Sequence, residues 1–134
     1  MMDNPATVVF VCEHGAAKSV VAAAYFNRVA AEMGLDLHAI ARGTHPDDDL
    51  SPQAIKGLAK DGLTPEESAP RRLAETDVKS ALRVIAFCEL PTEDDQQSKI
   101  QRWDDIPAVG ENYEKARDAI VARIRQMLEH EGMD

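Results

Sequence analysis

The sequence TVVFVCEHGAAKS at residues 7–19 decides how this chain folds. Residues 7–11 are a short apolar, β-branched run, which predicts a strand buried on both faces of a parallel sheet. A stretch of polar and small residues follows at 12–18. From 19 to 33 apolar residues recur at helical spacing, and Gly34 is placed to end the helix. The stretch is therefore predicted to form a strand, a tight loop and a helix.

The rest of the chain continues this alternation. Helices are predicted to begin at Ser51-Pro52 and to cover 112–129, and Pro65 and Pro70 favour a loop at 64–72. Further strands are predicted at 37–41, 83–88 and 99–103. Strands that alternate with helices indicate an α/β fold with a parallel sheet. Ligands bind such sheets beyond the carboxyl ends of the strands, where Cys12 and Cys88 are both predicted to lie as neighbours.

Length and composition narrow the classes of function. A chain of 134 residues is expected to form a single domain over 1–134. The formal net charge of −9 argues against a nucleic-acid partner, because such surfaces need clustered Lys and Arg. No apolar run is long enough to span a membrane, and the first residues lack a secretion pattern, so we expect a cytoplasmic protein. Its two cysteines are expected to be free or redox-active thiols.

The loop at 12–19 has the composition of an oxyanion site. Gly15, Ala16 and Ala17 are small enough for the backbone to curl around a ligand and turn its N–H groups inward, and the following helix adds its positive end. Thiols in such surroundings form the reactive thiolate, so Cys12 is the candidate nucleophile. The predicted oxyanion-binding residues are Glu13, His14, Gly15, Ala16, Ala17 and Lys18.

Ser19 and Lys18 complete the predicted chemistry. Ser19 is placed to donate a hydrogen bond to the Cys12 thiolate, and Lys18 to neutralise the charge that develops during attack. The alternative is a small core cysteine beside an ordinary strand-to-helix connection.

A nucleotide P-loop, Gly-x4-Gly-Lys-Ser, is disfavoured because Cys12 and Ala17 occupy both glycine positions. No metal site is predicted, since the histidines show no paired ligand spacing.

Several motifs together resemble the low-molecular-weight protein tyrosine phosphatase superfamily, which includes thioredoxin-coupled arsenate reductases. The family loop is Cys-x5-Arg-Ser, and Cys12-x5-Lys18-Ser19 is similar in spacing and placement. The resemblance continues through 41–46, 51–54 and 84–88 and into the last helix. It implies a three-layer, flavodoxin-like fold with a four-stranded parallel sheet flanked by helices. It also implies a small oxyanion or phosphomonoester substrate and no cofactor.

The chain departs from the family at two positions. Lys18 stands where the family has arginine, and lysine lacks the planar two-pronged grip on a phosphoryl group. The family's general acid is the aspartate of an Asp-Pro pair, but Ile106 precedes Pro107 here. Asp105 is the candidate acid instead, with Asp104 as the alternative, and a solvated turn is the competing interpretation.

Cys88 separates the two branches that the resemblance implies. Arsenate reductases carry a cysteine at the end of this strand, which attacks the cysteine–arsenic adduct and leaves a disulfide. Their third cysteine has no counterpart in 90–99, so a thioredoxin-like or small-thiol reductant would act directly on the pair. A buried cysteine without a redox role is the alternative. An arsenate-reductase-like enzyme is the favoured prediction, followed by a tyrosine phosphatase and then a non-catalytic phosphate-binding or sensor module.

Overall fold

The computed structural model describes residues 6–90 and 99–131. Its strands all run parallel in one four-stranded sheet with the order β2-β1-β3-β4. The elements along the chain are β1 (Ala6–Cys12), α1 (Lys18–Glu32), β2 (Leu37–Gly43), α2 (Pro52–Lys60), α3 (Glu75–Ser80), β3 (Arg83–Ala86), β4 (Ile100–Arg102) and α4 (Tyr113–Glu131). The predicted α/β fold with a four-stranded parallel sheet is confirmed.

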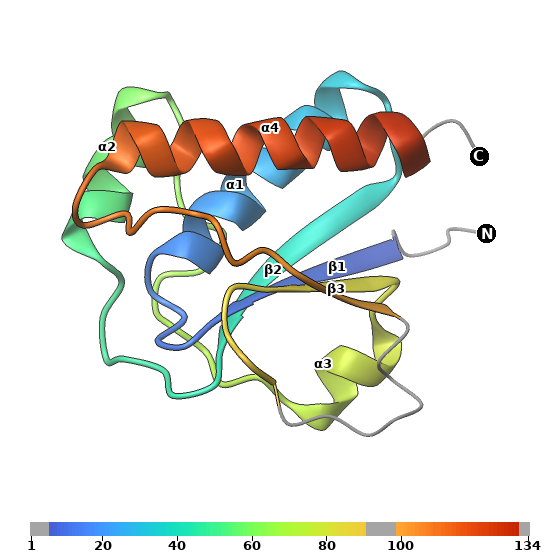
Figure 1. Ribbon diagram of the computed structural model, residues 1–134, viewed down its shortest axis with the longest axis horizontal. Coiled ribbons are helices and arrows are strands. Elements are labelled where there is room, and N and C mark those ends of the chain that lie inside the picture. Colours follow the sequence, from blue (N-terminus) through green and yellow to red (C-terminus); the bar gives the residue numbers. More distant parts are fainter. Residues whose placement is uncertain (1–5, 91–98, 132–134) are drawn as a thin grey trace.

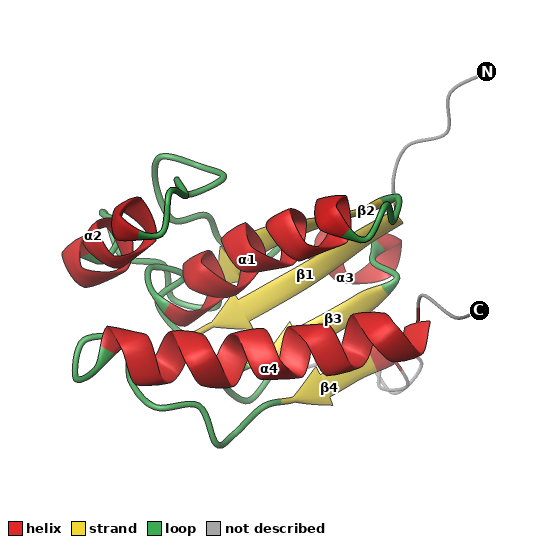
Figure 2. Ribbon diagram, turned by 90° about the horizontal axis from the view of Figure 1, so that it is seen from above, coloured by secondary structure: helices red, strands yellow, loops and turns green. Residues whose placement is uncertain are grey.

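Helices cover both faces of the sheet and make three layers. The helices α1 and α4 lie along one face, and the short α3 lies against the other (Figures 1 and 2). Side chains alternate along β1 as in any strand. Phe10 belongs to the cluster under α1 and α4, whereas Val9 and Val11 pack with Val78 of α3. Burial on both faces explains why the sequence of β1 is apolar throughout.

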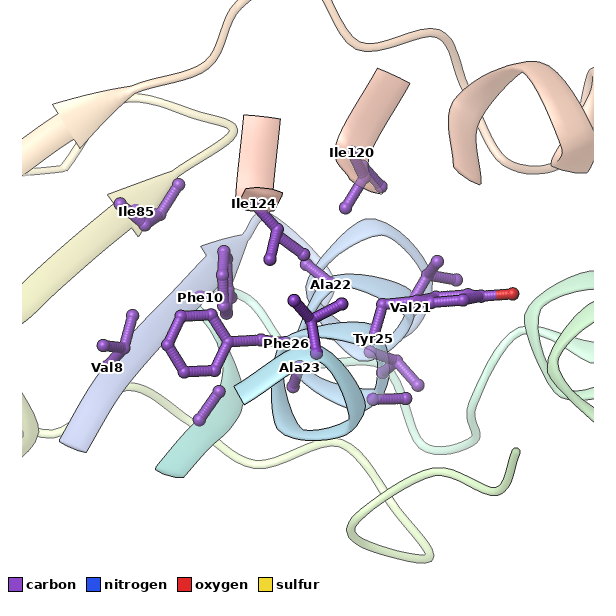
Figure 3. Packing of buried hydrophobic residues seen from close by; sticks show 14 of the residues in the cluster. Val8, Phe10, Val21, Ala22, Ala23, Tyr25, Phe26, Ile85, Ile120 and Ile124 are labelled. Carbon is purple, nitrogen blue, oxygen red and sulfur yellow. The ribbon is translucent and has the colours of Figure 1, made fainter. Parts of the chain in front are cut away.

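Aromatic side chains form the centre of the larger cluster. The Phe10 ring lies edge-on to Phe26 of α1, with 5.8 Å between the ring centroids. The Trp103 ring, just beyond β4, is also 5.8 Å from Phe10. Ile120 and Ile124 of α4 close this cluster from the other side (Figure 3). The packing fixes α1 against the sheet and therefore fixes where the loop before α1 must run.

A polar network joins the three helices on the α1 side of the sheet. Asp61, directly after α2, accepts hydrogen bonds from Tyr25 of α1 and from Tyr113 and Arg117 of α4. Burial raises the pKa of the Asp61 carboxyl, but these hydrogen bonds lower the pKa by more, so it lies below its ordinary value. The carboxylate is therefore the form that the folded protein stabilises.

The chain order places a switch point beside β1. The connection from β1 leads to β2 on one side, and the chain then returns to β3 on the other side of β1. Open parallel sheets bind ligands at such a point, beyond the carboxyl ends of the strands. Cys12 is the last residue of β1 and is paired with Gly43, while Val11 is paired with Ala86.

Several features differ from the prediction, and one of them is that β2 continues to Gly43 rather than ending at residue 41. The helix α3 was not predicted, because it has only six residues and buries a single one, Val78. The Asp77 carboxylate accepts a hydrogen bond from the Ala74 N–H at the start of this helix. The third strand ends at Ala86 rather than at Cys88, although the Phe87 N–H still donates to the Val11 carbonyl at 2.8 Å. Within 6–90 and 99–131 no helix has the length and apolar character to cross a membrane.

Candidate active site

The loop between β1 and α1 turns sharply at Gly15. This residue has a φ of 61°, in the left-handed region that side chains disfavour. It also lies against Gly43 at the end of β2, since a Cβ on Gly43 would lie 2.7 Å from the Gly15 nitrogen. A pair of glycines is therefore required where the loop crosses the end of β2.

Four carbonyl groups of this loop are held by the connection between β2 and α2. Each accepts a hydrogen bond from a backbone N–H of that connection. The pairs are Thr44 to Cys12 at 3.3 Å, His45 to Glu13 at 2.7 Å, Asp47 to His14 at 3.0 Å, and Ser51 to Ala16 at 2.9 Å.

These hydrogen bonds fix the direction of the loop N–H groups. In a trans peptide the N–H of the next residue points opposite to the carbonyl. The N–H groups that follow the four carbonyls therefore point away from the β2–α2 connection. None of the four donates a hydrogen bond within the described residues. They belong to Glu13, His14, Gly15 and Ala17. Unpaired N–H groups in successive loop residues form the kind of nest that binds anions.

Cys12 lies at the base of this loop beside Ser19. Its Sγ is 3.0 Å from the Ser19 Oγ, and either atom is able to donate. The exposed fractions are 9% for Cys12 and 0% for Ser19. Ser19 is the sole fully buried polar side chain among the described residues, and Cys12 is its partner. The predicted contact between the two is therefore present in the structure.

The start of α1 directs its positive end toward the same loop. Lys18 is the first residue of α1, and the first turn contains no acidic side chain. Free N–H groups at a helix start favour a bound anion, and Lys18 adds a formal charge next to them. Both features act on the space above Cys12.

A cleft of about 890 Å³ opens above the loop. Three segments line it besides the loop itself: the 47–53 connection, Phe87 with Cys88, and 108–110. Lys18 is the one Lys or Arg in this lining, and four carboxylates belong to the same lining. The lining carboxylates belong to Glu13, Asp47, Asp48 and Asp49. The volume lies in the usual range for small-molecule sites, so it admits a free oxyanion or a phosphorylated side chain.

Cys88 lines the same cleft as Cys12, as the sequence predicts. Both cysteines are free thiols. Burial raises the pKa of Cys88, a hydrogen bond with the Thr44 side chain lowers it, and the nearby charge of Cys12 raises it again. The net pKa of Cys88 lies above its ordinary value. The two sulfur atoms are thus close enough for the charge on one to affect the other.

The structure does not bring Asp105 into this cleft. Its carboxylate is 67% exposed and accepts a hydrogen bond from Arg123 of α4 at 2.7 Å. That hydrogen bond lowers the pKa of Asp105, which opposes a role as proton donor at neutral pH. The neighbouring Ile106 is 5% exposed and packs in the core.

Some lining residues were not predicted from sequence. Phe87 follows β3, and 108–110 lie in the connection from β4 to α4. Their spacing shows no motif, because tertiary packing alone brings them to the cleft. The exposed run 47–49 also lines the cleft. In the described part of the chain no group of His, Cys, Asp or Glu is arranged to hold a metal ion.

Known proteins share this fold. A family model described as low molecular weight phosphotyrosine protein phosphatase matches residues 7–131. A low molecular weight protein tyrosine phosphatase from T. tengcongensis is 23% identical with a TM-score of 0.78, over 93% of this chain and 99% of that one. An arsenate reductase from Archaeoglobus fulgidus is 24% identical with a TM-score of 0.74, over 91% and 98%. The arginine phosphatase YwlE from Geobacillus stearothermophilus is 18% identical with a TM-score of 0.80, over 96% and 94%.

Proposed function

Because this chain belongs to the low molecular weight phosphotyrosine protein phosphatase family, we propose that it is a cysteine-dependent enzyme that acts on a tetrahedral oxyanion, with arsenate as the favoured substrate. One observation carries the proposal: Cys12, Cys88 and a loop in which four N–H groups have no partner among the described residues all line one cleft. The alternative, a core cysteine beside an ordinary strand-to-helix connection, does not explain why these N–H groups lack partners.

In the first step the Cys12 thiolate attacks the arsenic atom. A sulfur–arsenic bond forms, an arsenic–oxygen bond breaks, and the departing hydroxide takes up a proton to leave as water. The loop N–H groups and Lys18 stabilise the negative charge on the remaining oxygens. The Ser19 hydroxyl donates to the Cys12 sulfur while it is the thiolate.

In the second step the Cys88 thiol attacks the Cys12 sulfur. The sulfur–arsenic bond breaks, its electron pair leaves with arsenic, and the Cys88 proton passes to solvent. Arsenic is reduced by two electrons to arsenite, and Cys12 and Cys88 are oxidised to a disulfide. A thioredoxin-like protein or a small thiol supplies the two electrons that restore both thiols. The proximity of the two cysteines in the cleft supports this step.

Phosphomonoester hydrolysis is the second candidate. It needs Cys12, Ser19 and the anion loop but not Cys88, and the 3.0 Å contact between Cys12 and Ser19 supports it. Attack of Cys12 on phosphorus would release the alcohol, and water would then release phosphate. The cleft is wide enough for the remainder of a phosphorylated side chain.

Two assays separate these candidates. Thiol-dependent production of arsenite from arsenate should be lost in Cys12→Ser and in Cys88→Ser. Hydrolysis of p-nitrophenyl phosphate should be lost in Cys12→Ser but kept in Cys88→Ser if the protein is a phosphatase. If both activities are absent while phosphate still stabilises the fold, the enzyme proposal is contradicted and a non-catalytic anion-binding module is favoured.

A further inference from the structure

In both proposed reactions one step, the protonation of the leaving oxygen, has not yet been assigned to a side chain. The leaving oxygen must be protonated, and the family resemblance gives this task to an aspartate that precedes a proline. Ile106 occupies that position and is buried in the core. Asp105 faces Arg123 outside the cleft lining. A proton donor for this cleft must therefore come from another element.

His14 lies in the anion loop, two residues after Cys12, and is one of the residues that line the cleft. The ring has one anchored end. Nδ1 is 3.3 Å from the His45 carbonyl oxygen and 3.3 Å from the Asp47 Oδ1. The other ring nitrogen, Nε2, lies 3.8 Å from a carboxylate oxygen of Glu13.

This arrangement resembles an imidazole oriented for proton transfer. A hydrogen bond from Nδ1 to an oxygen fixes the tautomer, so that Nε2 exchanges the proton. The Asp47 and Glu13 carboxylates flank the ring, one at each nitrogen. The ring is 55% exposed, so solvent is able to return a proton to it between turnovers.

The other ionisable groups of the cleft suit this task less well. Asp48 and Asp49 are exposed, and among the described residues no hydrogen bond or ion pair fixes the direction of either side chain. Lys18 carries the charge that balances the oxyanion, and Cys88 is the second thiol of the proposed reaction. Imidazole is the side chain that ordinarily gives and takes a proton near neutral pH.

We propose that His14 is the proton donor of this active site and that Asp47 is the residue that positions it. This inference rests on the proposed function. As the Cys12 sulfur bonds to arsenic or phosphorus, the bond to the leaving oxygen breaks and the Nε2 proton moves to that oxygen. In phosphatase turnover, neutral Nε2 then takes a proton from the water that attacks the phosphocysteine, and the thiolate leaves.

The test uses two aryl phosphates that differ in how readily their phenolate leaves, together with arsenate. His14→Gln keeps a polar side chain but removes the transferable proton. It should lower kcat/KM about 10²- to 10⁴-fold for phenyl phosphate and for arsenate, the usual range for general acid catalysis. For p-nitrophenyl phosphate, whose leaving group needs less help, the loss should stay below about tenfold. Asp47→Asn should show the same pattern with a smaller loss.

The matched control is His38→Gln. His38 also faces a carboxylate, Glu66, at 3.8 Å, but neither residue lines the cleft. This variant should keep wild-type kinetics on every substrate. The rise in Tm with phosphate should be equal in His14→Gln and the wild type, which separates loss of the proton donor from loss of the loop.

Each contrary outcome has a distinct meaning. An equal loss on both aryl phosphates, or none on any substrate, would overturn the role of His14 while leaving that of Cys12 intact. Loss of phenyl phosphate turnover in Asp105→Asn but not in His14→Gln would assign the proton to Asp105. Absence of any turnover that depends on Cys12 in the wild type would overturn the proposed function and this inference together.

Discussion

Replacing Gly43 with alanine tests the contact that shapes the anion loop. The new Cβ would lie 2.7 Å from the Gly15 nitrogen and 2.9 Å from its Cα. Both are backbone atoms, so no side chain is able to rotate out of the way. Gly43 does not have a positive φ, and alanine therefore suits its backbone conformation. The whole effect of the substitution is a displacement of the loop at Gly15.

The expected magnitude follows from two opposing terms. Overpacking of this kind costs about 1–3 kcal/mol. Alanine also restricts the unfolded chain, which offsets roughly 0.4–1 kcal/mol of that cost. The difference is a net loss of roughly 0–2.6 kcal/mol in unfolding free energy, and a value of about 1–2 kcal/mol is expected because only backbone atoms are able to give way. For a domain of this size it corresponds to a fall in Tm of roughly 4–8 °C.

Gly62→Ala is the matched control, because it should destabilise the fold without touching the site. Gly62 has a φ of 77°, and a Cβ added there would meet nothing within 4 Å, so alanine costs about 1–2 kcal/mol through backbone strain alone. The assay is thermal unfolding with and without phosphate, where a ligand at about 100 times its Kd stabilises by about 2.7 kcal/mol. Gly62→Ala should keep that shift and Gly43→Ala should lose most of it. A full phosphate shift in Gly43→Ala would refute the reasoning.

Three further predictions concern single side chains. The lowered pKa of Asp61 stabilises the fold above the ordinary carboxyl value near 4, and this contribution is lost as pH falls through the folded pKa. The unfolding free energy should therefore fall less between neutral and acid pH in Asp61→Asn than in the wild type. This variant should also be about 1–3 kcal/mol less stable at neutral pH. Lys18→Arg should raise kcat/KM by about tenfold, because guanidinium grips an oxyanion with two hydrogen bonds; steady-state kinetics that show no gain would place the limiting step elsewhere. Ser19→Ala should lower kcat/KM by about 10- to 100-fold, since Cys12 loses its 3.0 Å partner; unchanged turnover would show that the hydroxyl has no role in catalysis.

The fold was predictable where local patterns agree with the tertiary structure. The apolar run of β1, the helical stripe of α1 and the repeat along α4 each carry enough residues to indicate an element. The helix α3 escaped prediction because one buried valine in six residues gives no periodic signal. Cys88 lies just past β3, because only its neighbour Phe87 continues the pairing with β1.

The candidate site was predictable only in part for the same reason. The sequence of the loop indicates Cys12, Lys18 and Ser19, since all three lie within one short motif. The orientation of the loop N–H groups depends on hydrogen bonds that the loop carbonyls accept from the β2–α2 connection. That connection lies roughly 30 residues further along the chain, so no local pattern encodes these hydrogen bonds. Asp105 is the candidate acid because it lies two residues before Pro107, but its side chain is directed to Arg123 of α4.

Alkylation of Cys12 tests the central claim most directly. In Cys88→Ser the chain keeps one thiol, so the rate of its reaction with iodoacetamide reports Cys12 alone. Despite its 9% exposure, Cys12 should react faster than an ordinary exposed thiol at neutral pH, and phosphate should slow the reaction in proportion to site occupancy. A thiol that reacts slowly, at a rate that phosphate leaves unchanged, would contradict an anion site built around this sulfur.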